Sequence, residues 1–145
     1  MRIELWLTRL YIRIKGALMK VLICGSRGYT DEDLMRRVFK KLIEDGMRTL
    51  ITGGARGADR MAEKLATEFG IPNIVIPAKW NEYGKAAGVI RNSEMLKLEP
   101  DLVVAFFNGT TPGTRDMVKK ASDAGVRVDT IWSNDSKIKV MSSTA

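Results

Sequence analysis

Short apolar runs alternate with longer stretches of helical period along the chain from Lys20 onwards. Because the strands of a parallel sheet are short and apolar and are joined by helices, this alternation is typical of repeated βα units. Five runs predict strands: 21–25, 49–53, 73–77, 101–106 and 126–131. The stretches between them predict helices: 31–45, 58–69, 85–98 and 114–124. The sequence therefore predicts an α/β fold, a three-layer, Rossmann-like, doubly wound and mainly parallel five-stranded sheet flanked by helices.

The two ends of the chain depart from this alternation. Residues 1–19 fit both helical spacing and strand alternation, so they can be a basic amphipathic surface helix, an oligomerisation arm, or an extension from an early start codon. Met19-Lys20 directly precedes the first strong strand, which favours the extension. Residues 133–145 are polar and predict a frayed tail. We therefore expect one doubly wound domain over residues 20–132.

Composition narrows the chemistry. The 145 residues are 45% apolar and 28% charged, as expected for one globular core. The net charge is +7, of which residues 1–18 carry +3, so the body is only mildly basic and suits an anionic small molecule as well as nucleic acid. The sequence has no histidine, which argues against serine-hydrolase triads and zinc hydrolases. We predict no metal site and no certain cofactor.

The single cysteine, Cys24, lies inside an apolar run and has no partner for an internal disulfide. It is interpreted as a small buried side chain in a reducing compartment, which predicts a cytoplasmic protein. No uninterrupted apolar segment approaches the length of a membrane span, and cations interrupt the apolar positions of the first 18 residues. Neither a membrane span nor a signal peptide is expected.

The first strand ends in a turn that carries a glycine, a hydroxyl group and a cation: Gly25, Ser26 and Arg27. Glycine lets a ligand approach the backbone, while serine and arginine offer hydrogen-bond donors to an anion. In doubly wound sheets the ligand lies beyond the carboxyl ends of the strands. These three residues are therefore candidate ligand contacts, with a plain turn and an exposed arginine as the alternative.

The second strand ends in a glycine-rich segment that enters a helix. Successive small residues at a helix N-terminus expose amide N–H groups and a partial positive charge, which favour phosphate. The Gly-Gly-x-x-Gly spacing matches neither Gly-x-Gly-x-x-Gly nor a Walker loop, which argues against ordinary dinucleotide dehydrogenases and ATPases. Asp59 either stabilises the first helical turn or contacts a ribose. The candidate contacts are Gly53, Gly54, Ala55, Arg56, Gly57 and Asp59.

After the third strand, a loop and helix start bring aromatic, amide and cationic side chains together. Trp80 or Tyr83 can stack on a base, although aromatic side chains more often simply pack. Arg91 and Asn92 are placed to offer an arginine–phosphate and an asparagine–base contact. Trp80, Arg91 and Asn92 are therefore candidate site residues.

The fourth strand leads into a second glycine- and threonine-rich turn before a helix. By the same physics it is a second phosphate cradle, with Gly109, Thr110, Gly113 and Thr114 as its candidate contacts. Two such strand-to-helix turns near an expected switch in strand order favour one shared site over coincidence.

Together these motifs resemble the SLOG superfamily, specifically its YspA-like branch, over about residues 20–131. The resemblance rests on Gly25-Ser26-Arg27, Gly53-Gly54-Ala55-Arg56-Gly57-Ala58-Asp59, Ala78-Lys79-Trp80, Ala87-Gly88 with Arg91-Asn92-Ser93-Glu94-Met95, and Gly113-Thr114 with Met117. It implies a Rossmann-like fold that binds nucleotides or nucleotide-derived signals such as ADP-ribose derivatives. It also implies a homodimer or higher homo-oligomer, since relatives often pair through helices flanking the site.

The same resemblance leaves the reaction open. In the related Lonely Guy phosphoribohydrolases, a Pro-Gly-Gly-x-Gly-Thr-x-x-Glu turn supplies a catalytic glutamate and an arginine on a neighbouring helix assists. By this resemblance Arg91 matches the arginine, whereas Met117 stands at the glutamate position. Asp116 and Glu94 are the substitute acid–base candidates, and both can equally be surface carboxylates.

The sequence therefore predicts a protein that binds a phosphate-bearing nucleotide or nucleotide-derived ligand, either ADP-ribose-like or a nucleoside monophosphate. Whether the ligand is hydrolysed at its N-glycosidic bond stays open. One rival is a non-catalytic sensor or sponge for a nucleotide signal. Another is a single-stranded nucleic-acid binder, since a DNA-processing protein also belongs to the superfamily. Such a binder is expected to have a continuous basic groove with stacking aromatics.

Overall fold

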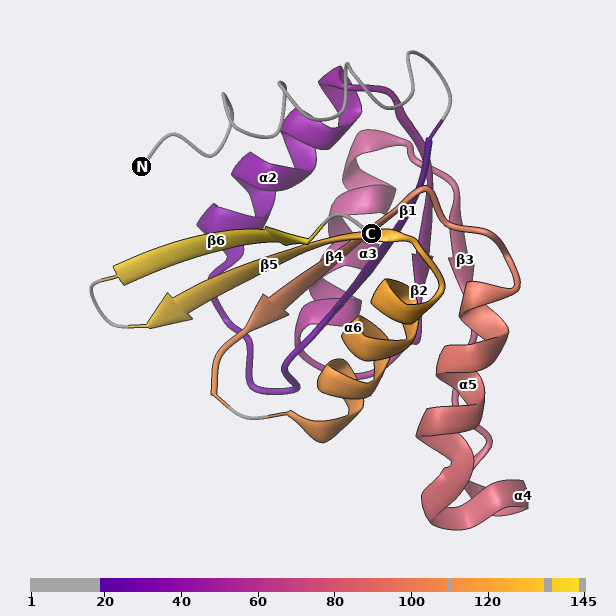
Figure 1. Ribbon diagram of the computed structural model, residues 1–145. Helices are drawn as coiled ribbons and strands as arrows, with labels where there is room; N and C mark the ends of the chain where they lie inside the picture. Colours follow the sequence, from indigo (N-terminus) through magenta and orange to yellow (C-terminus); the bar gives the residue numbers. More distant parts are fainter. Residues whose placement is uncertain (1–18, 110, 135–136, 144–145) are drawn as a thin grey trace.

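The computed structural model describes residues 19–109, 111–134 and 137–143. They form one sheet of six strands in the order β3-β2-β1-β4-β5-β6 (Figure 1). The first five strands are parallel: β1 (Met19–Gly25), β2 (Met47–Thr52), β3 (Asn73–Val75), β4 (Leu102–Phe107) and β5 (Arg127–Asn134). The predicted α/β class and the parallel order of these five strands are confirmed.

The end of the chain differs from the prediction. Residues Lys137–Ser143, expected as part of a frayed polar tail, form β6, which pairs antiparallel with β5. The sequence does contain a strand signal there, since Ile138 and Val140 alternate with Lys137 and Lys139. The sheet is therefore mainly parallel but has six strands rather than five. The interpretations of residues 1–18 lie outside the described residues.

The helices cover both faces of the sheet (Figure 1). The connections on one face are α2 (Glu32–Glu44) and α3 (Ala58–Phe69), and those on the other are α5 (Ala87–Leu96) and α6 (Pro112–Asp123). The predicted helix 85–98 is divided: the short α4 (Trp80–Tyr83) and the 3-10 turn η1 (Gly84–Ala86) precede α5. In the parts of the chain that the structure describes, no helix is long and apolar enough to cross a bilayer.

Each face of the sheet has its own apolar layer. In β1, Val21 and Ile23 pack toward α2 and α3, whereas Leu22 and Cys24 pack toward α5 and α6. This division follows from the period of two along a strand, and it explains why strands buried on both faces are continuously apolar in the sequence. Cys24 is buried and free, as its apolar surroundings predict.

The strand order reverses between β1 and β4, which are neighbours in the sheet. The chain leaves β1 for the α2–α3 face and leaves β4 for the α5–α6 face. The two connections diverge at the carboxyl ends of these strands, which opens the crevice where doubly wound proteins bind ligands.

Candidate functional site

Two adjoining pockets of about 530 and 560 Å³ lie at this crevice. Arg27, Ala55, Trp80 and Arg91 line both pockets, so the two form one cleft. The smaller pocket is lined in addition by Gly53, Gly54, Arg56, Arg60, Pro77 and Ala78. The larger pocket continues to the start of α6 and has a more apolar floor. Its floor includes Cys24, Met95 and Met117.

The turn between β2 and α3 does not present all of its amides to the cleft. One carboxylate oxygen of Asp59, Oδ2, accepts hydrogen bonds from the amides of Gly53 and Ala55, each at 3.2 Å. The amide of Ala58, the first residue of α3, donates to the carbonyl oxygen of Ser26 at 3.2 Å. Three amides of the glycine-rich turn predicted as a phosphate cradle, those of Gly53, Ala55 and Ala58, are therefore already bonded within the protein.

Asp59 is 5% exposed, and the exposed part lines the larger pocket. Burial raises the pKa of its carboxyl group to about 6, against the lowering effects of the Ala55 amide and the Arg91 charge. No hydrogen bond to its other oxygen, Oδ1, is found within the described residues. Asp59 thus holds the turn with one oxygen and offers the other to the cleft.

The turn after β4 is arranged differently. Thr111, the N-cap of α6, makes no side-chain capping bond to the helix; its hydroxyl group lies 2.8 Å from that of Ser26. Among the described residues there is no acceptor for the amides of Gly113 and Thr114. The Thr114 side chain is 4% exposed, lines the larger pocket, and its hydroxyl group has no partner in the described part of the chain. The N-terminus of α6 therefore opens into the cleft.

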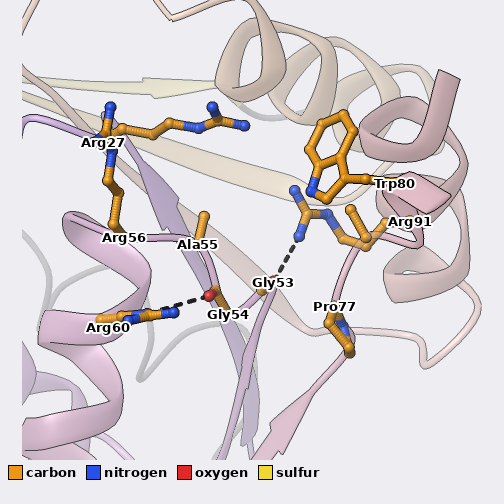
Figure 2. Close-up of a pocket in the computed structure, with 10 residues that line it drawn as sticks. Arg27, Gly53, Gly54, Ala55, Arg56, Arg60, Pro77, Trp80 and Arg91 are labelled. Atoms are coloured by element: carbon orange, nitrogen blue, oxygen red, sulfur yellow. Dashed lines mark hydrogen bonds between the residues drawn. The ribbon is translucent and has the colours of Figure 1, made fainter. Parts of the chain in front are cut away.

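Arg91 crosses the cleft from α5 to the β2 turn. Its Nη1 donates to the carbonyl oxygen of Gly53 at 2.6 Å (Figure 2). Its Nε donates to Oδ1 of Asn92 at 3.1 Å. Asn92 is 3% exposed and its Nδ2 donates to the Gly113 carbonyl oxygen at 3.1 Å. These bonds join α5 to both glycine-rich turns. Adjacent residues of a helix point in different directions, and here Arg91 reaches the turn after β2 while Asn92 reaches the turn after β4.

Four arginines converge on the smaller pocket: Arg27, Arg56, Arg60 and Arg91. Arg27 extends toward Trp80, with its guanidinium carbon 5.7 Å from the ring centroid (Figure 2). Trp80 is 49% exposed, so part of its ring is open to a ligand. Two further cations line the cleft without having been predicted from the sequence: Arg60 in the smaller pocket and Lys85 in the larger one. The spacing of four residues between Arg56 and Arg60, at the start of a predicted helix, could have indicated that Arg60 shares a pocket with Arg56.

Several predicted residues lie apart from the pocket lining. Gly57 and Gly109 line neither pocket, and Thr110 lies outside the described residues. Asp116 and Glu94, the acid–base candidates, also line neither pocket. Asp116 instead accepts hydrogen bonds at its Oδ2 from Asn92 and Lys120, each at 2.9 Å.

The remaining predicted contacts do line the cleft: Gly25, Ser26, Arg27, Gly53, Gly54, Ala55, Arg56, Asp59, Trp80, Arg91, Asn92, Gly113 and Thr114. Met117, which the family resemblance matches to the Lonely Guy glutamate, is buried and lines the larger pocket. Over the described ranges, no group of three or more acidic, cysteine or histidine side chains is placed to hold a metal ion.

The fold and site define a Rossmann-like α/β protein with a cationic cleft at its switch point. A model of the YspA, cpYpsA-related SLOG family, YAcAr, matches residues 19–83. The Gene 61 protein of Mycobacterium phage D29 is 35% identical over 119 residues, which cover 75% of this chain and 93% of the phage protein. The chain therefore belongs to the YspA, cpYpsA-related SLOG family.

Among solved structures, the chain is similar to phosphoribosylglycinamide formyltransferase from Coxiella burnetii in complex with CHES, with 20% identity and a TM-score of 0.46. The alignment covers 78% of this chain. The chain spans 50% of the length of that enzyme.

Proposed function

We propose that the protein binds a phosphate-bearing nucleotide or nucleotide-derived ligand, such as a nucleoside monophosphate or an ADP-ribose-like molecule, in the cleft beyond β1 and β4. The observation that carries this proposal is the open N-terminus of α6. Its amides and the Thr114 hydroxyl group, which has no partner among the described residues, line the same pocket as Arg27 and Arg91. Amide donors, a helix dipole and guanidinium groups are the combination that stabilises a bound phosphate.

The rest of the larger pocket suits a nucleoside. The half-exposed Trp80 ring offers a stacking surface for a base, and the free Oδ1 of Asp59 is an acceptor for a ribose hydroxyl group. A nucleoside monophosphate can therefore place its phosphate at α6 and its ribose near Asp59. This assignment moves the phosphate from the β2 turn, where Asp59 already holds two amides, to the turn after β4.

The test compares Gly113→Asp with Gly113→Asn. A Cβ atom at Gly113 meets nothing within 4 Å, so both side chains can be accommodated, and an acidic residue in the first turn favours the helix. Isothermal titration with nucleoside monophosphates, NAD and ADP-ribose should show binding to wild type and Gly113→Asn. For Gly113→Asp we expect affinity at least about tenfold weaker, because its carboxylate repels the phosphate.

Equal ligand affinity in the two Gly113 variants would contradict the phosphate position. Failure of wild type to bind any member of the panel, together with tight, salt-dependent binding of single-stranded DNA, would replace the proposal with nucleic-acid binding.

Hydrolysis of the N-glycosidic bond is a second candidate, and Asp59 is the residue that favours it. In this reaction the oxygen of water bonds to the anomeric carbon, the carbon–nitrogen bond breaks, and the leaving base takes up a proton. A carboxyl group of pKa about 6 that lines the pocket is suited to such a transfer near neutral pH. Chromatography after incubation distinguishes the candidates, since a released base supports hydrolysis and an intact, retained ligand supports a sensor or sponge.

Homo-oligomer formation and a cytoplasmic location stay predictions of the sequence. Sedimentation of the full chain with and without ligand measures the first.

A further inference from the structure

Two parts of the cleft carry groups that favour anions, a helix N-terminus and a cluster of arginines, and they line different pockets. The N-terminus of α6 lines the larger pocket, whereas Arg56 and Arg60 line only the smaller one. Arg27, Trp80 and Arg91 line both, so they lie between the two parts. In Figure 2, Arg56 and Arg60 lie on the α3 side of the smaller pocket, and Trp80 lies opposite them.

The smaller pocket carries an unbalanced positive charge. It is lined by the four arginines and by no carboxylate. Within the described residues these arginines form no ion pair, whereas Arg36 pairs with two glutamates and Arg127 pairs with Asp129. Burial lowers the pKa of Arg91, the nearby Asp59 carboxylate raises it, and repulsion from the Arg27 charge, a smaller effect, lowers it. An anion bound in this pocket would relieve that repulsion.

Building on the proposed function, we propose that the ligand is a nucleotide with two phosphate groups at separate positions. One phosphate binds at the N-terminus of α6, and the other binds among Arg27, Arg56 and Arg60. The nucleoside between them packs against Trp80. Arg91, whose guanidinium group lies between the two pockets, faces both phosphates.

The separation of the two parts distinguishes ligand types. A monophosphate fills one anion position and leaves the other empty. A diphosphate has directly joined phosphates, which fit within a single pocket. A nucleoside 3′,5′-bisphosphate, or a dinucleotide with a 5′-phosphate, carries phosphates on either side of one ribose, which matches two anion positions flanking Trp80.

The experiment measures affinity by isothermal titration for the 5′-monophosphates, 5′-diphosphates and 3′,5′-bisphosphates of adenosine, guanosine, cytidine and uridine, and for 5′-phosphorylated dinucleotides. The variant Arg56→Gln/Arg60→Gln removes two charges from the smaller pocket. Arg48→Gln/Lys97→Gln removes two exposed charges, one at the start of β2 and one just after α5, at the end of the strands opposite the cleft, and controls for net charge. Circular dichroism confirms that both variants are folded.

For at least one base we expect the bisphosphate to bind at least about tenfold more tightly than the monophosphate. Arg56→Gln/Arg60→Gln should remove this advantage and leave monophosphate affinity within about threefold of wild type, while the control variant keeps the advantage. A dinucleotide that binds still more tightly identifies a nucleic-acid end as the source of the two phosphates; a dinucleotide no tighter than the bisphosphate identifies the free nucleotide.

Equal affinities for monophosphate and bisphosphate, or a diphosphate that binds as tightly as the bisphosphate, would overturn the two-position proposal and leave the proposed function intact. Loss of monophosphate binding in Arg56→Gln/Arg60→Gln would also overturn it, because the first phosphate would then lie in the smaller pocket. If no nucleotide binds wild type, the proposed function fails as well.

Discussion

The carboxylate of Asp59 lies at the point where β2 passes into α3. The charge of Arg91 lowers its pKa and that of Glu63 raises it, while Asp59 itself raises the pKa of the Cys24 thiol. Burial is the largest influence on Asp59 and raises its pKa from the ordinary value of 3.8 to about 6. The native state therefore holds this proton more tightly than the unfolded chain does. Its stabilising contribution is complete below about pH 4 and is lost as the pH rises through about 6.

We expect the free energy of unfolding to fall by about 1–3 kcal/mol between pH 4 and pH 7 because of this group. Asp59→Asn should flatten the fall, since an amide oxygen can still accept from Gly53 and Ala55 but does not titrate. Urea unfolding at several pH values measures it. Burial also raises the pKa of Asp45, so Asp45→Asn measures the share of the fall in stability that comes from this second carboxyl group. An unchanged pH profile in Asp59→Asn would show that this carboxyl group titrates normally.

Gly53 shows how closely one residue couples the turn to the ligand site. A Cβ atom there would lie 2.3 Å from Nη1 of Arg91, the far end of a flexible side chain. Gly53→Ala should therefore displace Arg91 from the Gly53 carbonyl oxygen and weaken ligand binding about tenfold, with at most about 1 kcal/mol lost in stability. Calorimetric titration and urea unfolding give the two quantities.

Gly28→Ala is the matched control for Gly53→Ala. Gly28 also lines the cleft, but a Cβ atom there meets nothing within 4 Å. Similar affinities in the two variants would mean that Arg91 makes no contact with the ligand.

At the level of elements, α3 is fixed to the β1 turn by its first residues. Gly57, the N-cap of α3, has φ 81°, and a Cβ atom there would lie 2.4 Å from the carbonyl oxygens of both Ser26 and Arg27. Since backbone cannot move aside as a side chain can, Gly57→Ala should cost about 3 kcal/mol or more of stability. Gly70, at the other end of the helix, has φ 70° with nothing within 4 Å of a Cβ atom.

Gly70→Ala therefore isolates the backbone strain, about 1 kcal/mol, from the collision. Chemical unfolding of both variants provides the comparison. If the two substitutions cost the same, the contact between the α3 start and the β1 turn does not hold the helix in place.

The sequence predicts elements well where a local pattern decides them. The apolar runs of the five parallel strands and the period of α2, α3 and α6 are such patterns, and the structure matches them within a few residues. The prediction of a polar tail is wrong at β6, a seven-residue strand with alternating Ile138 and Val140. Its pairing with β5 is a contact that no local pattern reveals. The division before α5 depends on Gly84, whose φ of 56° ends α4.

For the site, the sequence predicts which turns line the cleft but not which of their amides are free to bind a ligand. Glycines and arginines after strands indicate which turns line the cleft, and the strand order brings them together. Whether an amide is open or already bonded depends on three-dimensional partners. In the β2 turn, the stronger sequence signal, Asp59 already binds the amides of Gly53 and Ala55, whereas Thr111 makes no capping bond in the turn after β4.

For the whole molecule, stability and binding should be separable because the cleft lies at β1 and β4 while β6 lies at the edge of the sheet. β6 pairs with β5 along its length, from Asn134 with Lys137 to Val128 with Ser143. Deleting the chain from residue 135 onwards removes these bonds and exposes β5 as an edge strand. We expect a loss of at least about 2 kcal/mol in the free energy of unfolding, with ligand affinity within about twofold of wild type.

This pattern is the reverse of the one expected for Gly113→Asp, which should weaken binding and leave stability unchanged or slightly higher. Measuring urea unfolding and titration with the nucleotide that binds wild type best, for both variants, therefore tests the location of the site. A truncated chain that remains folded but loses affinity would place part of the ligand contact near β6, and the cleft at the switch point would then be only a portion of the site.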